Sequence, residues 1–199
     1  MGMSDVVAVT ITADTVALDA DGISVAASVG NNAALVIGGA LASGGAVALS
    51  HGRIVTILSA GNDAAKSFTV TGDAQTESIT GANAGTATGT KYFLTISGIS
   101  AVGNPAGNVS AGVNGSAADV IFAGRSRLKG IYLTSTATAG TVDLLNTSPS
   151  GTSIMGLSSV GDADATRDVV IPENGVVFSS GIYIQYTAST FLTLTVFHA

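Results

Sequence analysis

The sequence predicts an all-β protein made of two antiparallel β-sandwich or jelly-roll-like domains in tandem. Short runs of β-branched and aromatic residues alternate with polar residues, as is typical of half-buried strands. Clusters of Gly, Asn and Asp separate these runs at intervals of about 8–12 residues. No window of helical length shows a sustained period of 3.6 residues. These observations together favour sandwiches or barrels over a helical fold.

The clearest strand–turn–strand signal lies in residues 65–100. Thr alternates with apolar side chains there, which predicts strands over Ser67–Thr71, Gln75–Thr80 and Lys91–Ser97. The intervening segment Gly81–Gly89 (GANAGTATG) contains only small residues, so we expect a long exposed loop.

The same pattern predicts earlier strands over Val6–Thr12, Ile23–Ala27, Ala33–Ile37, Ala46–Leu49 and Ile54–Leu58. Residues 33–49 form the longest uncharged apolar stretch of the chain. This stretch is short for a membrane span of about 20 residues, and it contains four glycines. We therefore interpret it as two strands joined through Gly44-Gly45 rather than as a span.

A domain junction is predicted at Asn114-Gly115-Ser116, after a strand over Val109–Val113. It divides the chain into an N-terminal β domain, residues 1–116, and a C-terminal β-sandwich, residues 117–199. The Asn174-Gly175 pair predicts a tight turn in the second domain. The strands predicted there are Val120–Ala123, Leu128–Ser135, Thr141–Leu145, Thr152–Gly156, Asp168–Ile171, Val176–Phe178, Ile182–Tyr186 and Phe191–Phe197.

The composition predicts an obligate oligomer. Of 199 residues 26 are Gly and only 5% are aromatic, so each residue buries little apolar surface. The chain has no Cys, and disulfides therefore cannot stabilise it. Burial between subunits is the remaining source of stability.

The charge pattern bears on partners and location. The chain has 7 basic and 13 acidic residues, a net charge of −6 and no basic stripe, so we expect no nucleic-acid partner. Mean hydropathy is high, at +0.53, but no segment has the length of a membrane span. The N-terminal residues MGMSDVVAVT lack the basic and apolar regions of a signal peptide. We therefore expect assembly in a cytoplasm, without a membrane.

Few residues suggest a metal site. Neither His51 nor His198 has a Cys or a carboxylate nearby in the sequence, whereas zinc needs three or four ligands. Two groups of acids offer the oxygen ligands that Ca²⁺ prefers but lack the spacing of an EF-hand loop, so we interpret them as turn residues. These groups are Asp162, Asp164 and Asp168, and Asp19 with Asp21.

Catalytic patterns are incomplete. Residues 151–156 (GTSIMG) resemble a nucleophile elbow, but the spacing is G-x-S-x-x-G rather than G-x-S-x-G. Asp14 and Glu77 are candidates for a glycosidase pair, but nothing in the sequence pairs them. We therefore expect no enzyme activity and no cofactor.

The one concentrated group of charges is Arg125, Arg127 and Lys129, three of the seven bases within five residues. In an extended backbone all three would lie on the same side. One interpretation is a solvated strand face or an edge protected from aggregation. The other is a possible interface that binds carboxylates on an acidic partner.

Two segments resemble modules of viral proteins. Arg53–Val113, which includes RIVTILSAGNDAAKSFTVTG and TGTKYFLTISGISAVGNPAGNVSAGV, resembles a module of virion structural proteins of tailed bacteriophages. From Asp119 onward, DVIFAGRSRLKGIYLTSTATAGTVDLLN and IPENGVVFSSGIYIQYTASTFLTLTVFHA resemble a β-sandwich module of small phage structural proteins, including head-decoration (cement) proteins. The first fifty residues match weakly. At Gly72-Asp73-Ala74-Gln75 the hairpin turn is shorter than in the family pattern.

The resemblance implies a capsid decoration protein that forms a homotrimer, binds the major capsid protein of the assembled head and stabilises it. Its location would be the capsid surface of the virion, with the N-terminal domain contacting the shell or another partner. The alternative is a tail-associated or fibre/adhesin protein that binds a host surface glycan. That alternative needs an exposed aromatic cluster, for which Tyr183, Tyr186 and Phe191 are the only neighbouring candidates. An enzyme on a β scaffold would need convergent catalytic groups.

Overall fold

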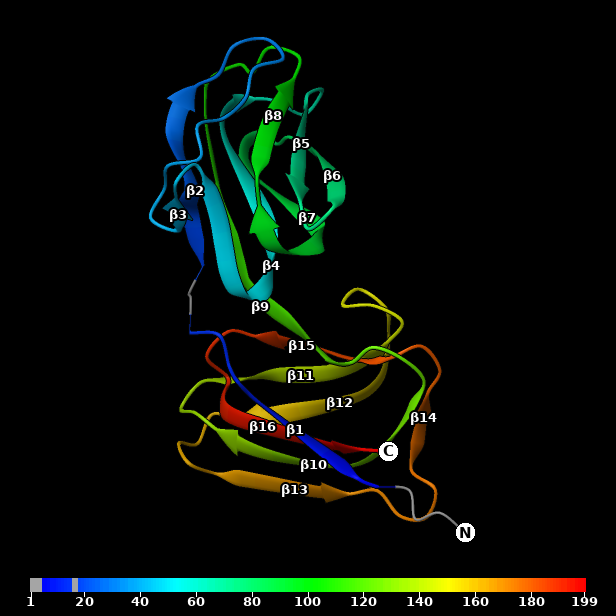
Figure 1. Cartoon of the computed structure of the whole chain (residues 1–199). Coiled ribbons are helices and arrows are strands. Elements are labelled where there is room, and N and C mark those ends of the chain that lie inside the picture. Colours follow the sequence, from blue (N-terminus) through cyan, green and yellow to red (C-terminus); the bar gives the residue numbers. More distant parts are fainter. Residues whose placement is uncertain (1–4, 16–17) are drawn as a thin grey trace. The chain divides into compact units, whose positions relative to one another are not determined.

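The structure is a computed structural model that describes residues 5–15 and 18–199. These residues form antiparallel strands and no helix, which confirms the predicted all-β, sandwich-type fold. The chain divides into two compact units (Figure 1). Among the described residues, unit 1 combines 5–15 with 116–199, and unit 2 comprises 18–115.

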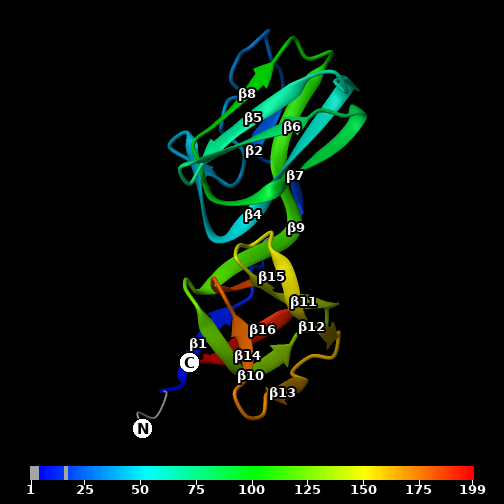
Figure 2. The same ribbon diagram turned by 90° about the vertical axis from the view of Figure 1, so that its right-hand side faces the viewer.

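Unit 1 contains two layers of strands (Figures 1 and 2). The first layer, the β10 sheet, has the order β1–β16–β10–β13, and β14 also pairs with β10. Its strands are β1 (Val7–Thr12), β10 (Ser126–Ser135), β13 (Thr166–Val170), β14 (Val176–Phe178) and β16 (Phe191–His198). The second layer has the order β12–β11–β15–β9. Its strands are β12 (Thr152–Val160), β11 (Ala139–Asn146), β15 (Ile182–Thr187) and the second part of β9 (Asn108–Phe122).

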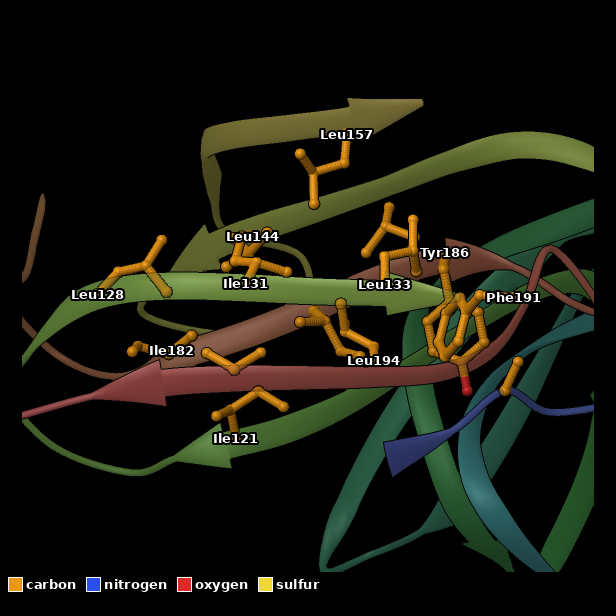
Figure 3. Close-up of a cluster of buried hydrophobic side chains, with 14 of the residues drawn as sticks. Ile121, Leu128, Ile131, Leu133, Leu144, Leu157, Ile182, Tyr186, Phe191 and Leu194 are labelled. Carbon is orange, nitrogen blue, oxygen red and sulfur yellow. The ribbon is translucent and has the colours of Figure 1, made fainter. Parts of the chain in front are cut away.

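Both layers contribute to one apolar core (Figure 3). The β10 sheet contributes Ile131, Leu133 and Leu194 to this core. The second layer contributes Leu144 and Ile184, and all five side chains are completely buried. Alternate residues of each strand point inward because side chains of a strand alternate between its two faces. The alternation read from the sequence therefore corresponds to a packed sandwich.

Unit 2 contains a larger sheet and a three-stranded sheet, β6–β5–β8. In the larger sheet β9 pairs with β2 and is followed by β4, which pairs with β3 and β7. Buried side chains come from both sheets, among them Ile57, Phe68, Phe93 and Val109. The strands are β2 (Asp19–Ser28), β3 (Ala42–Ser43), β4 (Ala46–Asn62), β5 (Ser67–Gly72), β6 (Gln75–Thr80), β7 (Asn83–Ile96), β8 (Gly98–Val102) and the first part of β9.

The division of the chain differs from the predicted domains 1–116 and 117–199. Strand β1 belongs to unit 1, because it pairs antiparallel with the last strand, β16, from Val7 opposite His198 to Thr12 opposite Thr193. Unit 2 is thus inserted into unit 1 after its first strand. The expected junction at residues 114–116 coincides with the boundary between the units, but it lies inside the continuous strand β9, which belongs to both units.

Two local predictions need correction. The expected loop Gly81–Gly89 is largely strand, because residues 85–88 pair with β4 in regular register, and backbone pairing does not require large side chains. Gly89 leaves room for the carboxylate of Glu77. Ala33–Ile37 forms a single bridge, Ala34 to Ser100, beside β8. The turn at Gly44-Gly45 is confirmed, with both residues at positive φ between β3 and β4.

The short hairpin turn between β5 and β6 is a two-residue turn. Asp73 and Ala74 both have positive φ, as a two-residue hairpin turn of type I′ requires. The Asp73 carboxylate accepts hydrogen bonds from the backbone N–H of Leu94 and from both the N–H and the hydroxyl of Thr95. The turn is therefore held against β7.

Candidate interaction surface

The most extended candidate surface is the outer face of the β10 sheet, which we define as the side turned away from the core of unit 1. Residues directly opposite each other on neighbouring strands lie on the same face. The register then gives three rows that cross β1, β16, β10 and β13. The rows are Ala8, Phe197, Gly130 and Val170; Thr10, Thr195, Tyr132 and Asp168; and Thr12, Thr193, Thr134 and Thr166.

The three rows differ in chemistry. The first is entirely apolar, and Val170 at its end is 77% exposed. In the second, Tyr132 is 40% exposed, and the hydroxyls of Thr10 and Thr195 are 2.8 Å apart. The third contains only threonines. Asp168 is the one ionisable carboxylate in these rows, so the face is nearly uncharged, and exposed apolar groups on such a face are typical of interaction sites.

The structure separates the three predicted interface cations. Arg127 and Lys129 lie on β10 and are half-buried, whereas Arg125 is exposed in the connection before that strand. Arg127 Nη1 donates to the carbonyl of Asn174 at 3.1 Å, and Lys129 Nζ donates to the carbonyl of Glu173 at 3.2 Å. Two of the three bases thus hold a turn. Their charges have no carboxylate partner among the described residues.

The turn that these bases hold is the one predicted from Asn174-Gly175. The N–H of Gly175 donates to the carbonyl of Pro172 at 3.2 Å, and Glu173 and Gly175 have positive φ. An arginine has five N–H donors, so Arg127 keeps donors for a further acceptor. The basic group therefore borders the outer face of the β10 sheet and remains a candidate for binding carboxylates.

The residues weighed for chemistry do not converge. His198 is buried, with Nδ1 3.0 Å from Ser126 Oγ and its ring 4.9 Å from that of Phe122, and burial lowers its pKa. Ser153 lies in strand β12 and donates to Asp143 Oδ1, not to a histidine. No group of three or more His, Cys, Asp or Glu is placed to hold a metal ion in the part of the chain that the structure describes.

The acids singled out in the sequence are dispersed. Asp14 belongs to unit 1 and Glu77 to unit 2. Glu77 Oε1 accepts from the hydroxyl of Thr90 at 2.9 Å and from the N–H of Lys91 at 3.2 Å. Asp164 lies in a turn with positive φ, and its N–H donates to the carbonyl of Ser135. The Glu77 carboxylate therefore has structural partners, and Asp164 is held in its turn through its backbone.

The aromatic cluster required for glycan binding is mostly core. Tyr186 and Phe191 are each 2% exposed, and their ring centroids are 4.8 Å apart (Figure 3). The Tyr186 hydroxyl accepts the N–H of Asp14 and donates to Asp119 Oδ2, both at 3.1 Å. Burial, followed by the charge of Asp119, strongly raises the pKa of Tyr186. This tyrosine therefore anchors the segment after β1.

Sequence reasoning missed the apolar row. The alternation over Phe191–Phe197 does place Phe197 on the same side as Thr193 and Thr195, but it does not show which strands lie beside β16. Tyr132 joins this face through the pairing of β10 with β16, and Val170 joins it through the pairing of β10 with β13. No helix in residues 5–15 and 18–199 is long and apolar enough to cross a membrane.

Comparisons with protein-family models, with curated proteins and with solved structures found no match to this chain. The resemblance to phage virion modules therefore stays a prediction from the sequence.

Proposed function

We propose that this chain is a structural protein of a tailed-bacteriophage virion, a head-decoration or cement protein. In this proposal it binds the major capsid protein of the assembled head and stabilises the shell at the capsid surface. It acts as a homo-oligomer, for which the sequence resemblance favours a trimer.

The observation that supports this function is the outer face of the β10 sheet. It offers a row of apolar groups across four strands, with Tyr132 beside it and two cations, Arg127 and Lys129, at its border. Such a surface fits a broad protein partner with apolar and carboxylate groups better than a small substrate. A protein that binds the assembled shell but not its free subunits stabilises the shell by mass action. Repetition of a weak contact over many sites multiplies that effect.

The proposal is tested on particles from the culture that produces this protein. We expect the chain to sediment with DNA-filled heads and to be present in many copies per head. Heads stripped of it should break at a lower temperature, and addition of the purified chain should restore their resistance. If the chain is missing from particles, or is found only on tails, head decoration is wrong.

A pair of matched variants tests which unit docks. Tyr132→Asp places a charge on the outer face of the β10 sheet, and Val25→Asp places one on unit 2, where Val25 is similarly exposed. We expect Tyr132→Asp to lose head binding and Val25→Asp to retain it. The reverse result would favour shell contact through unit 2, in line with the sequence-based expectation for the N-terminal domain.

A further inference from the structure

Strand β12 is an unprotected sheet edge. It pairs only with β11, and in the described residues none of its backbone groups bonds to any other strand. Its nine residues, TSIMGLSSV, include no charged residue and no proline. A row of free N–H and C=O groups on one side of a strand is a template for another strand.

The other edges of unit 1 are shorter or protected. Strand β13 carries Arg167 and Asp168 and is followed by Pro172. Strand β14 has three residues and β1 has six. Natural sheets protect their edges with charges, prolines and short strands, and β12 has none of these features. Its bulge, at Ile154, leaves residues 155–160 in regular pairing with β11.

We propose that β12 pairs antiparallel with β12 of a second copy of this chain, about a two-fold axis at Leu157. In this register Ile154 of each copy lies opposite Val160 of the other copy, and Gly156 lies opposite Ser158. Ile154 and Val160 are the two large apolar side chains exposed on β12, at 43% and 59%. The pairing brings each beside an apolar neighbour and extends the β12–β11–β15–β9 layer across both copies.

A second copy fits this edge better than an unrelated strand. In a two-fold contact both chains use the same surface. A charged residue on β12 would therefore lie near the same charged residue of the other chain. With no charge on β12, self-pairing carries no like-charge repulsion. This inference rests on the self-association in the proposed function but gives a two-fold dimer instead of the trimer that the sequence resemblance favours, because an isologous two-fold contact closes at two copies. It is tested on the purified chain alone, so its failure leaves the test of head binding unaffected.

The first test measures the mass of the full-length chain by light scattering during gel filtration. We expect the mass of two 19.4 kDa chains for the wild type and of one chain for Ser158→Lys. Val102→Lys is the matched control, because it places the same charge at an exposed position of another edge strand, β8, and it should stay a dimer. A monomeric wild type, a trimer, or a dimer that survives Ser158→Lys would overturn the proposal.

The second test uses the absence of cysteine to determine the register. The double variant Ile154→Cys, Val160→Cys should form disulfide-linked dimers under mild oxidation, whereas neither single variant should do so. Within one chain the two positions are six residues, or about 20 Å, apart along the strand, which is too far for a disulfide. Cross-linking of a single variant, or none in the double variant while circular dichroism shows it folded, would overturn this pairing.

Discussion

Unit 1 and unit 2 stabilise their buried polar groups in different ways. In unit 1 these groups are mainly hydroxyls and an imidazole that bond to one another or to nearby backbone. Ser126 Oγ lies 3.0 Å from His198 Nδ1, and the Ser159 hydroxyl donates to the carbonyl of Thr190 at 3.0 Å. The rest of the core is aliphatic and aromatic.

In unit 2 three carboxylates accept backbone hydrogen bonds, and two of them, Asp63 and Glu77, are buried, whereas Asp73 is exposed. The fully buried Asp63 accepts the N–H of Ala106 at 2.7 Å through Oδ1, while Asp73 and Glu77 accept N–H groups of β7. Hydrogen bonds to a charged acceptor are stronger than bonds between neutral groups. Each acid therefore fixes a turn or a strand end that the small side chains around it cannot hold by packing.

Unit 2 also brings backbone segments close together within its strands, whereas in unit 1 the closest such approaches lie in turns, at Gly151 and Gly175. A Cβ at Gly112 would lie 1.8 Å from the carbonyl oxygen of Asp19, and one at Gly72 would lie 1.8 Å from that of Thr95. The comparison indicates that the stability of unit 1 depends mainly on the packing of large side chains. The stability of unit 2 depends more on bare backbone, meaning close contacts between strands at glycines, and on carboxylates that bind the backbone.

The largest effect should come from Gly112→Ala. The new methyl group would collide with the backbone of β2, which cannot move without loss of pairing, so we expect a loss of about 3–5 kcal/mol in the free energy of unfolding. Gly115→Ala in the same strand is the matched control, because nothing lies within 4 Å of its Cβ position. Equal urea midpoints for the two variants would contradict the dependence of unit 2 on bare backbone.

Removal of residues 1–15 tests the insertion of unit 2 into unit 1. The chain loses β1, and with it Val9 and Ile11, which pack against the core of unit 1. We expect unit 1 to lose on the order of 3 kcal/mol, because burial of an aliphatic side chain contributes about 1.5–3 kcal/mol. Hydrogen exchange measured by mass spectrometry should show faster exchange in β16 and β10 and unchanged exchange in β5. Faster exchange confined to unit 2 would instead place β1 with that unit.

Local alternation in the sequence was sufficient to predict most strands, but not their partners. The pattern in Val6–Thr12 predicts a strand, yet nothing in it indicates that the partner is β16, at the other end of the chain. Residues 114–116 do mark the boundary between the units, but Asn, Gly and Ser, which are common in turns, do not indicate that the strand continues through it. Tertiary pairing overrides local preference at such positions.

The candidate surface was predictable only in part for the same reason. The spacing of Arg125, Arg127 and Lys129 suggests a row, and two of the three do share a face of β10. Arg125 lies outside the strand because β10 begins at Ser126, opposite Phe178. The neighbours of this row on β13 and β16 depend on register, which the sequence does not reveal.

Glu77→Ala should have an intermediate effect, and it tests the role of carboxylates in unit 2. The substitution leaves the N–H groups of Thr90 and Lys91 without this acceptor, so we expect a loss of about 2 kcal/mol in the free energy of unfolding. Glu77→Gln, which keeps one carbonyl oxygen, should lose less. Asp162→Ala, in an exposed turn, serves as the control and should be nearly neutral. If the Asp162 variant loses as much as the Glu77 variant, the effect is one of overall charge rather than of these bonds.

The smallest effect is a pH dependence that belongs to unit 1. Burial lowers the pKa of His198 below its ordinary value of 6.5, so the folded protein keeps this imidazole neutral where the unfolded chain already binds a proton. Above pH 6.5 the ring is neutral in both states, so His198 does not lower the free energy of unfolding. As the pH falls from 6.5 toward the pKa of the folded state, the free energy of unfolding decreases. His198→Gln should remove this part of the decline in urea-unfolding free energy measured between pH 7.5 and 5. A decline as steep as in the wild type would show that it does not come from His198.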